Sequence, residues 1–201
     1  MNYLAHLYLA GDEAADRVGG LMGDFVRGPL PGALPPDLAA GVALHRAIDA
    51  WADTHPAFQA SRARVSPVRR RVAGIMVDLY YDHFLARDWS RYHHLPLTDF
   101  AAMAYAETAA RSDALPERLA QQLPNMRQYD WLASYADPAN VGYALDRMAQ
   151  RLRQPNSLAG AGEELLRDYA GFAADFALFL PDARAFAEAW RRRNTAGSEA
   201  P

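Results

Sequence analysis

The sequence predicts an all-α fold in a single domain. Apolar residues recur at helical spacing, turns rich in proline and glycine separate these stretches, and no stretch shows a convincing strand pattern. The length of 201 residues suits one domain, and the 51% of hydrophobic residues is enough to build a sizeable core. We expect residues 1–193 to form a single helical bundle and residues 194–201 to be a disordered tail.

Composition excludes several classes of protein. The net charge of -3 and the pI of about 6.0 give no reason to expect nucleic-acid binding. The chain has no cysteine, which excludes disulfides, zinc–thiolate sites and cysteine nucleophiles. We see no signal peptide, and no apolar run reaches the roughly 20 residues that span a bilayer. A cytoplasmic protein that makes no membrane contact is expected.

The first helix is predicted for residues 2–10. This stretch is apolar apart from Asn2 and His6, and its leucines and alanines favour a helix over a strand. Asn2 is placed to cap the helix. A single histidine in such a segment is most often a core residue bonded to a backbone carbonyl, so His6 alone is weak evidence of a site.

The second helical pattern begins at Asp12 and ends at Gly28-Pro29. Three glycines inside it each cost roughly 1 kcal/mol relative to alanine, and they let another backbone or a ligand approach closely. Asp24 follows the last of these glycines, and Arg27 lies within one turn of it. A surface ion pair is the alternative explanation of these two charges.

The third helix, residues 37–52, follows a turn-rich connection and has Pro36 in its first turn. His45 and Asp49 are four residues apart, so they share one face. They can bind the same metal, or Asp49 can orient His45; a simple hydrogen bond within the helix is the alternative. Arg46 lies beside them.

The fourth helix is predicted from Ser66-Pro67 to about residue 88. Its first turns carry three arginines, which oppose the helix dipole and so either bind an anionic partner or are solvated. Its later part is apolar but contains two acids on one face and a histidine, which are costly to bury uncompensated. The arginines are Arg69, Arg70 and Arg71, and the later polar residues are Asp78, Asp82 and His83.

The second half of the chain contains helices but no comparable set of acids and histidines. The last helix is amphipathic, with an aromatic stripe that is typical of a core, and Pro181 is a candidate break. The predicted helices are residues 98–112, 116–122, 124–135, 138–153 and 163–193.

The acids and histidines of the first 90 residues form one site if their helices pack together. Imidazole and carboxylate ligands without cysteine suit Mn²⁺, Fe²⁺, Mg²⁺ or Zn²⁺. Such an ion activates water and stabilises charge on a phosphoryl oxygen, which is the chemistry of phosphoester hydrolysis. The alternative is that the acids form structural ion pairs with arginines. The converging residues are His6, Asp24, His45, Asp49, Asp78 and Asp82.

Four ordered motifs resemble those of the acyl carrier protein phosphodiesterases, also called acyl carrier protein hydrolases. They are MNYLAHLYLA at 1–10, GDFVRG at 23–28, HRAID at 45–49 and DLYYDHFLARDW at 78–89. The resemblance implies a helical fold related to the HD phosphohydrolases, with Mn²⁺ as the favoured ion and Mg²⁺ or Fe²⁺ as alternatives. It also implies hydrolysis of the phosphodiester between 4′-phosphopantetheine and a serine of holo acyl carrier protein.

Within this family pattern Asp24 carries over most directly, followed by His6, Asp78, Asp82 and His83. The wider HD superfamily reads His, then His-Asp, then Asp, whereas this chain has the doublet in reversed order. Its ligands therefore cannot be transferred position by position. Either member of the doublet is a ligand while the other supports it, because they point about 100° apart on a helix.

The resemblance also suggests roles for other side chains. Asp24 would hold the metal or orient the attacking water, and His6 or His45 would act as general acid or base. Phosphate oxygens would be bound by Arg27 and Arg46 through forked hydrogen bonds. Docking of the acidic acyl carrier protein would be steered by Arg69, Arg70 and Arg71. The candidates for lining a pantetheine channel are Tyr8, Tyr80 and Tyr81.

Two other functions fit the same residues. One is an HD-type phosphohydrolase that acts on a nucleotide or another small phosphoester. The other is a non-catalytic helical module that binds an acidic partner.

Overall fold

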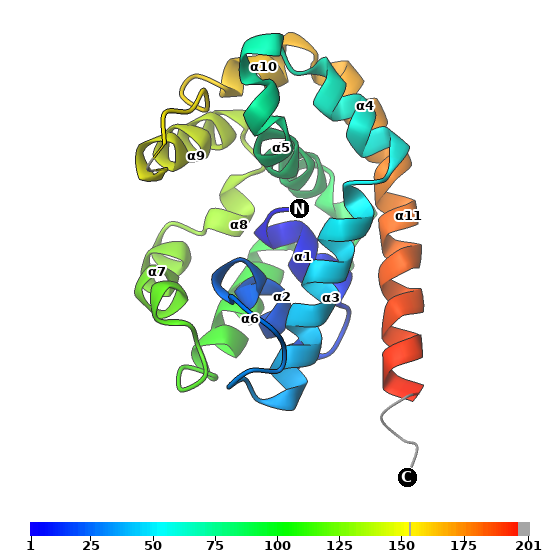
Figure 1. Cartoon of the computed structure of the whole chain (residues 1–201), viewed down its shortest axis with the longest axis vertical. Coiled ribbons are helices and arrows are strands. Elements are labelled where there is room, and N and C mark those ends of the chain that lie inside the picture. Colours follow the sequence, from blue (N-terminus) through cyan, green and yellow to red (C-terminus); the bar gives the residue numbers. More distant parts are fainter. Residues whose placement is uncertain (153, 197–201) are drawn as a thin grey trace.

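The computed structural model describes residues 1–152 and 154–196, and all regular elements among them are helical (Figure 1), which confirms the all-α prediction. The α-helices are α1 (Tyr3–Ala10), α2 (Ala14–Met22), α3 (Pro36–Ala52), α4 (Pro56–Arg64), α5 (Ala73–Arg87), α6 (Leu97–Ala109), α7 (Glu117–Gln128), α8 (Trp131–Ser134), α9 (Pro138–Arg151), α10 (Gly162–Arg167) and α11 (Tyr169–Ala196). Short 3₁₀ helices are η1 (Gly23–Phe25), η2 (Pro67–Val72) and η3 (Trp89–Arg91).

Helices α2 and α3 touch backbone to backbone. A Cβ added to Gly19 would lie 2.6 Å from the Cα of Gly41, and one added to Gly41 would lie 2.8 Å from the carbonyl oxygen of Asp16. Only residues without side chains permit this approach, which explains glycines that are unfavourable in a helix interior. The close crossing brings η1, at the end of α2, against the middle of α3.

Helix α5 lies in the core, and the aromatic stripe of α11 packs against it. Tyr80 and Tyr81 are fully buried, and their rings lie 5.0 Å from Phe172 and 5.4 Å from Phe176, respectively. The prediction that this stripe belongs to the core is confirmed. The long α11 runs along one side of the molecule, and the start of α1 lies near its centre (Figure 1).

Several helix boundaries differ from the prediction. The break expected at Pro181 is wrong, because α11 continues through it and the interruption lies at Asp168, between α10 and α11. Pro124 likewise lies inside α7. Residues 67–72 form a 3₁₀ helix, so α5 begins only at Ala73. A proline removes one backbone donor, and packing of the flanking turns holds each helix together.

Helix α4 is absent from the prediction because its sequence, PAFQASRAR, offers few apolar residues at helical spacing. It begins where His55 accepts a hydrogen bond from the backbone nitrogen of Ala57 at 3.3 Å. Helix α11 reaches Ala196, three residues into the range predicted as a tail, and 197–201 lie outside the described residues. In the part of the chain that the structure describes, no helix combines the length and apolarity needed to span a membrane.

Candidate active site

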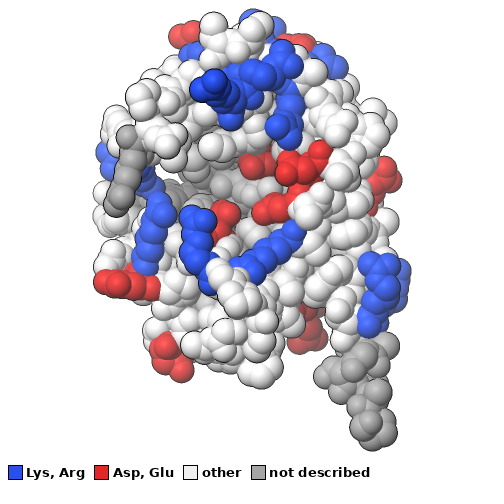
Figure 2. All heavy atoms as spheres, viewed as in Figure 1, with Lys and Arg blue, Asp and Glu red and all other residues white. Residues whose placement is uncertain are grey.

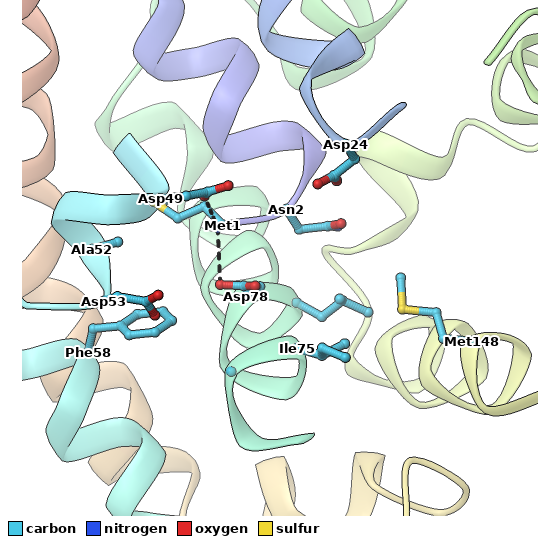
Figure 3. Close-up of a pocket in the computed structure, with 12 residues that line it drawn as sticks. Met1, Asn2, Asp24, Asp49, Ala52, Asp53, Phe58, Ile75, Asp78 and Met148 are labelled. Atoms are coloured by element: carbon cyan, nitrogen blue, oxygen red, sulfur yellow. Dashed lines mark hydrogen bonds and ion pairs between the residues drawn. The ribbon is translucent and has the colours of Figure 1, made fainter. Parts of the chain in front are cut away.

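A cavity of about 300 Å³ opens beside the start of α1. Three carboxylates, Asp24 of η1, Asp49 of α3 and Asp78 of α5, face the same space from different elements (Figure 3). The cavity is lined by Met1, Asn2, Asp24, Asp49, Ala52, Asp53, Phe58, Gly74, Ile75, Asp78, Leu79 and Met148.

Asp49 is the centre of the polar cluster at this cavity. Its Oδ1 lies 3.1 Å from Nε2 of His6, and its Oδ2 lies 3.2 Å from Nε2 of His45. The same His45 nitrogen lies 3.6 Å from Oδ1 of Asp24. The structure therefore brings together four of the predicted site residues, which come from α1, η1 and α3.

The rings of His6 and His45 stack, with centroids 3.6 Å apart and planes inclined by 20°. Burial, together with the charge of His45, lowers the pKa of His6 to about 4. Burial also opposes charge on His45, but its bonds to Asp24 and Asp49 raise its pKa to about 9. At neutral pH the stacked pair therefore carries one positive charge, which resides on His45.

The orientation of His45 is fixed by the end of α2. Its Nδ1 donates to the carbonyl oxygen of Gly20 at 2.8 Å, so Nε2 is the nitrogen that faces the carboxylates. A Cβ on Gly23 would overlap the His45 ring. The sequence signalled a close approach by the three glycines of this stretch, but it did not identify the imidazole as the approaching group.

Replacing Gly23 with alanine is expected to displace the His45 ring and so weaken both folding and any activity of the site. Overpacking of this kind costs about 1–3 kcal/mol of unfolding free energy. Urea unfolding and a turnover assay on the same preparation measure the two effects. The matched control is Gly142→Ala in α9, where the added Cβ meets only ordinary contacts at 3.6 Å. Wild-type turnover in Gly23→Ala would show that the ring position is unimportant.

Asp78 is joined to this cluster through the amino group of Met1. That group is buried and lies 2.6 Å from Oδ1 of Asp49 and 3.2 Å from Oδ1 of Asp78 (Figure 3). Burial opposes its charge, but Asp78 and Asp49 raise its pKa to about 11. Burial raises the pKa of the Asp78 carboxyl, and the ammonium opposes that rise.

Asp82 lies outside the cluster and caps α1 instead. Its carboxylate accepts hydrogen bonds of 2.9 Å from the backbone nitrogens of Leu4 and Ala5 and from the side-chain amide of Asn2. Burial raises the pKa of Asp82 to about 7 against these three bonds. Asn2 occupies the N-cap position of α1 as predicted, but its side chain makes no capping bond. The carboxylate of Asp82, from α5, accepts the capping hydrogen bonds instead.

His83 faces away from the cavity, toward α8 and α11. Its Nδ1 lies 2.8 Å from the carbonyl oxygen of Tyr135, and its Nε2 lies 2.7 Å from the hydroxyl of Tyr169. Burial lowers its pKa. Both ring nitrogens of His83 are thus engaged, and the Asp82 carboxylate caps α1. The structure therefore supports neither residue of the Asp82-His83 doublet as a metal ligand in the cluster.

The predicted phosphate- and partner-binding arginines fall into two groups. Arg46 donates to the carbonyl oxygens of Val26 and Gly28 and so holds the loop after η1. Arg69 similarly donates to the carbonyl oxygen of Ala159. The second group consists of exposed arginines that make no hydrogen bond or ion pair with described residues, namely Arg27, Arg70 and Arg71.

The predicted aromatic channel is wrong for two of its three residues. Tyr80 and Tyr81 are fully buried, and the Tyr80 hydroxyl donates to the carbonyl oxygen of Ala161 at 2.7 Å. Tyr8 lines a different cavity, of about 430 Å³, near the other end of α1. Tyr80 is two residues from both Asp78 and Asp82, which is about 200° around a helix, so it points to another face than these acids.

The residues of the cluster fit a divalent metal ion. Ligand atoms of His6, His45 and Asp49 all lie within 4.8 Å of one another, and Asp24 adjoins them. Two imidazoles with carboxylates and no thiolate match divalent transition metals better than Mg²⁺, which prefers oxygen ligands. One buried atom there, Nδ1 of His6, has no hydrogen-bond partner among the described residues. Such atoms are unusual in a cluster that serves only structure.

Comparison with known proteins decides the family. The family model described as acyl carrier protein phosphodiesterase matches residues 1–183. The chain belongs to the acyl carrier protein phosphodiesterase family. All of the cluster residues lie within the matched range. The sequence-based assignment to this family of enzymes is confirmed, whereas its relation to the HD phosphohydrolases stays a prediction.

Curated acyl carrier protein phosphodiesterases are similar to the chain over nearly its whole length. The protein of that name from Serratia proteamaculans is 36% identical over 182 residues, which is 90% of this chain and 94% of the relative. That of Photorhabdus laumondii is 35% identical over 90% of this chain and 92% of the relative. The protein of that name from Escherichia coli O157:H7 is 34% identical over 96% of this chain and 99% of the relative. No solved structure is significantly similar to the chain.

Proposed function

We propose that this family member is a divalent-metal-dependent phosphodiesterase that removes 4′-phosphopantetheine from holo acyl carrier protein. The products would be apo acyl carrier protein and 4′-phosphopantetheine, and Mn²⁺ is the ion we favour. The observation that carries the proposal is the cluster of His6, His45 and Asp49 beside an acidic cavity. Relatives named for this substrate support it over a small phosphoester.

The side chains of the cluster would bind the metal ion. A bound divalent ion supplies a lowered pKa for water and stabilises charge on the phosphoryl oxygens. His6, His45 and Asp49 would hold the ion, and the hydrogen bond from Nδ1 of His45 to Gly20 leaves Nε2 facing the carboxylates.

Asp24 is the residue best placed to handle the attacking water. Its side chain is 48% exposed at the cavity, so water reaches it. Burial raises its pKa, but the ion pair with His45 outweighs this and leaves the pKa below the usual value. The carboxylate is therefore ionised at neutral pH, and it orients the water and accepts a proton from it.

The decisive experiment measures loss of the prosthetic group. Holo acyl carrier protein is incubated with the enzyme and Mn²⁺, and its mass is followed by mass spectrometry. The expected result is a fall by the mass of the phosphopantetheine group, with none in the presence of a chelator. Hydrolysis of a nucleotide or bis-p-nitrophenyl phosphate without this fall would favour the small-phosphoester alternative. Binding without metal or turnover would favour the non-catalytic module.

Metal binding is expected to release a proton from His45. With a pKa of about 9, this imidazole is protonated at pH 7.5, and a ligand must be neutral. The affinity should therefore rise about tenfold per pH unit as pH increases from roughly 6.5 to 9, and then level off. Calorimetric titration of Mn²⁺ in buffers of different ionisation enthalpy gives the number of protons released. A result of zero would contradict this assignment.

Docking of the acidic carrier protein is expected to depend on Arg70 and Arg71. Both are exposed, and beside them Val68 is 77% exposed. Exchanging both arginines for glutamate should raise KM for holo acyl carrier protein by roughly 10–100-fold, more at low salt, with little change in kcat. The control, Arg192→Glu with Arg193→Glu, makes the same charge change on the exposed end of α11. Equal KM values for the two double variants would contradict docking at η2.

A further inference from the structure

An arginine that the sequence did not single out lies beside η1. Arg118, in the first turn of α7, has its guanidinium carbon 5.9 Å from the ring centroid of Phe25. Phe25 in turn stacks on Tyr3, with centroids 6.1 Å apart and planes inclined by 15°. Since Phe25 directly follows Asp24, this stack joins α7 and α1 to the element that carries a cavity carboxylate.

The guanidinium of Arg118 keeps its donors free. It makes no hydrogen bond or ion pair with any residue in the described ranges 1–152 and 154–196. By contrast, Arg46 donates to two backbone carbonyls nearby. An arginine held over an aromatic ring loses little side-chain freedom on binding, and its five donors match phosphoryl oxygens in pairs.

The charge of a second arginine acts on the same tyrosine. Burial and the charge of Asp24 raise the pKa of Tyr3 to about 12, whereas Arg118 and Arg151 oppose that rise. Arg151 is exposed at the end of α9 and has no ion-pair partner within the described part of the chain.

The charges around the cavity are thus separated by sign. The cavity is lined by carboxylates, which suit a cation, whereas the Tyr3–Phe25 stack carries the Arg118 guanidinium, which suits an anion. Figure 2 shows blue arginine side chains bordering a hollow in which red carboxylates lie. All 21 basic side chains of the protein are arginines, so each has the planar fork needed for bidentate contacts.

We propose that Arg118, held over the ring of Phe25, binds the non-bridging phosphoryl oxygens of the substrate beside Asp24. This inference rests on the proposed function. It assigns to Arg118 the positioning role that the sequence suggested for Arg46, whose donors hold the loop after η1.

The test compares two ligands that differ only in the phosphate. Binding of 4′-phosphopantetheine and of pantetheine to the full chain is measured by calorimetry, with inorganic phosphate as a third probe. Arg118→Gln is expected to weaken the binding of 4′-phosphopantetheine roughly 10–100-fold and to leave the binding of pantetheine unchanged. Phe25→Leu removes only the ring beneath the guanidinium, and it should lower the affinity for 4′-phosphopantetheine several-fold. Arg127→Gln is the matched control, because it makes the same change on the same helix.

The outcomes separate this inference from the proposed function. Equal affinity of Arg118→Gln and wild type for 4′-phosphopantetheine overturns the anion site, even if holo acyl carrier protein is a substrate. No binding of any phosphate probe by the wild type overturns it as well. If holo acyl carrier protein is not hydrolysed but Arg118→Gln selectively loses the phosphate ligands, the proposed function fails and the anion site stands. Circular dichroism confirms that each variant is folded.

Discussion

Replacing Asp49 with asparagine is expected to abolish metal binding and to lower turnover by roughly 10³-fold or more. This carboxylate contacts His6, His45 and the Met1 amino group at once, so its charge holds the cluster together. Its pKa is far below the usual range because bonds from the two histidines outweigh burial. Metal content is measured by elemental analysis and turnover by the mass-spectrometric assay.

The control for this variant is Asp53→Asn, one helical turn further along α3. Asp53 lines the same cavity, but it pairs only with Arg62, at 3.3 Å, and its side chain is 67% exposed. Near-normal metal content and turnover are expected for it. A wild-type metal content in Asp49→Asn would remove Asp49 from the ligand set.

Asp82→Ala is expected to destabilise the protein by about 3–5 kcal/mol, because truncation leaves three buried donors without an acceptor. Asp82→Asn keeps one acceptor oxygen, so it should lower the free energy of unfolding by less. Urea unfolding followed by circular dichroism measures both. These variants also separate structural from catalytic roles. A properly folded Asp82→Asn protein should retain its metal, since Asp82 contacts α1 rather than the histidines.

A surface pair supplies the comparison for this measurement. Asp37 is half-exposed and pairs with Arg111 at 2.8 Å, and such pairs contribute at most about 1 kcal/mol. Asp37→Ala should therefore leave the unfolding midpoint nearly unchanged. A loss as small in Asp82→Ala would contradict the capping role.

Much of the helical architecture follows from the sequence, because apolar periodicity and proline or glycine boundaries are local signals. The grouping of His6, Asp24, His45 and Asp49 was also accessible. Each lies in an apolar stretch that must be buried, and a buried acid or histidine needs a partner. The helices that bury them have few ways to pack.

The outcome for α5 shows what sequence alone leaves open. Periodicity fixes the angle between Asp82 and His83 but not which neighbour each one meets. That depends on contacts between residues about 80 positions apart, such as the bonds from Asp82 to α1. The role of Gly23 was hidden for the same reason, since its neighbour His45 belongs to another helix.

The cap on α1 has a consequence for biosynthesis. An isolated helix of eight residues is unstable in water, and the acceptor for its first turn lies 77 to 80 positions further along the chain. At about 5–20 residues per second, a ribosome needs roughly 4–16 s to supply it. Nascent α1 therefore waits unfolded as an apolar segment until α5 is made, and during this interval a chaperone has access to it.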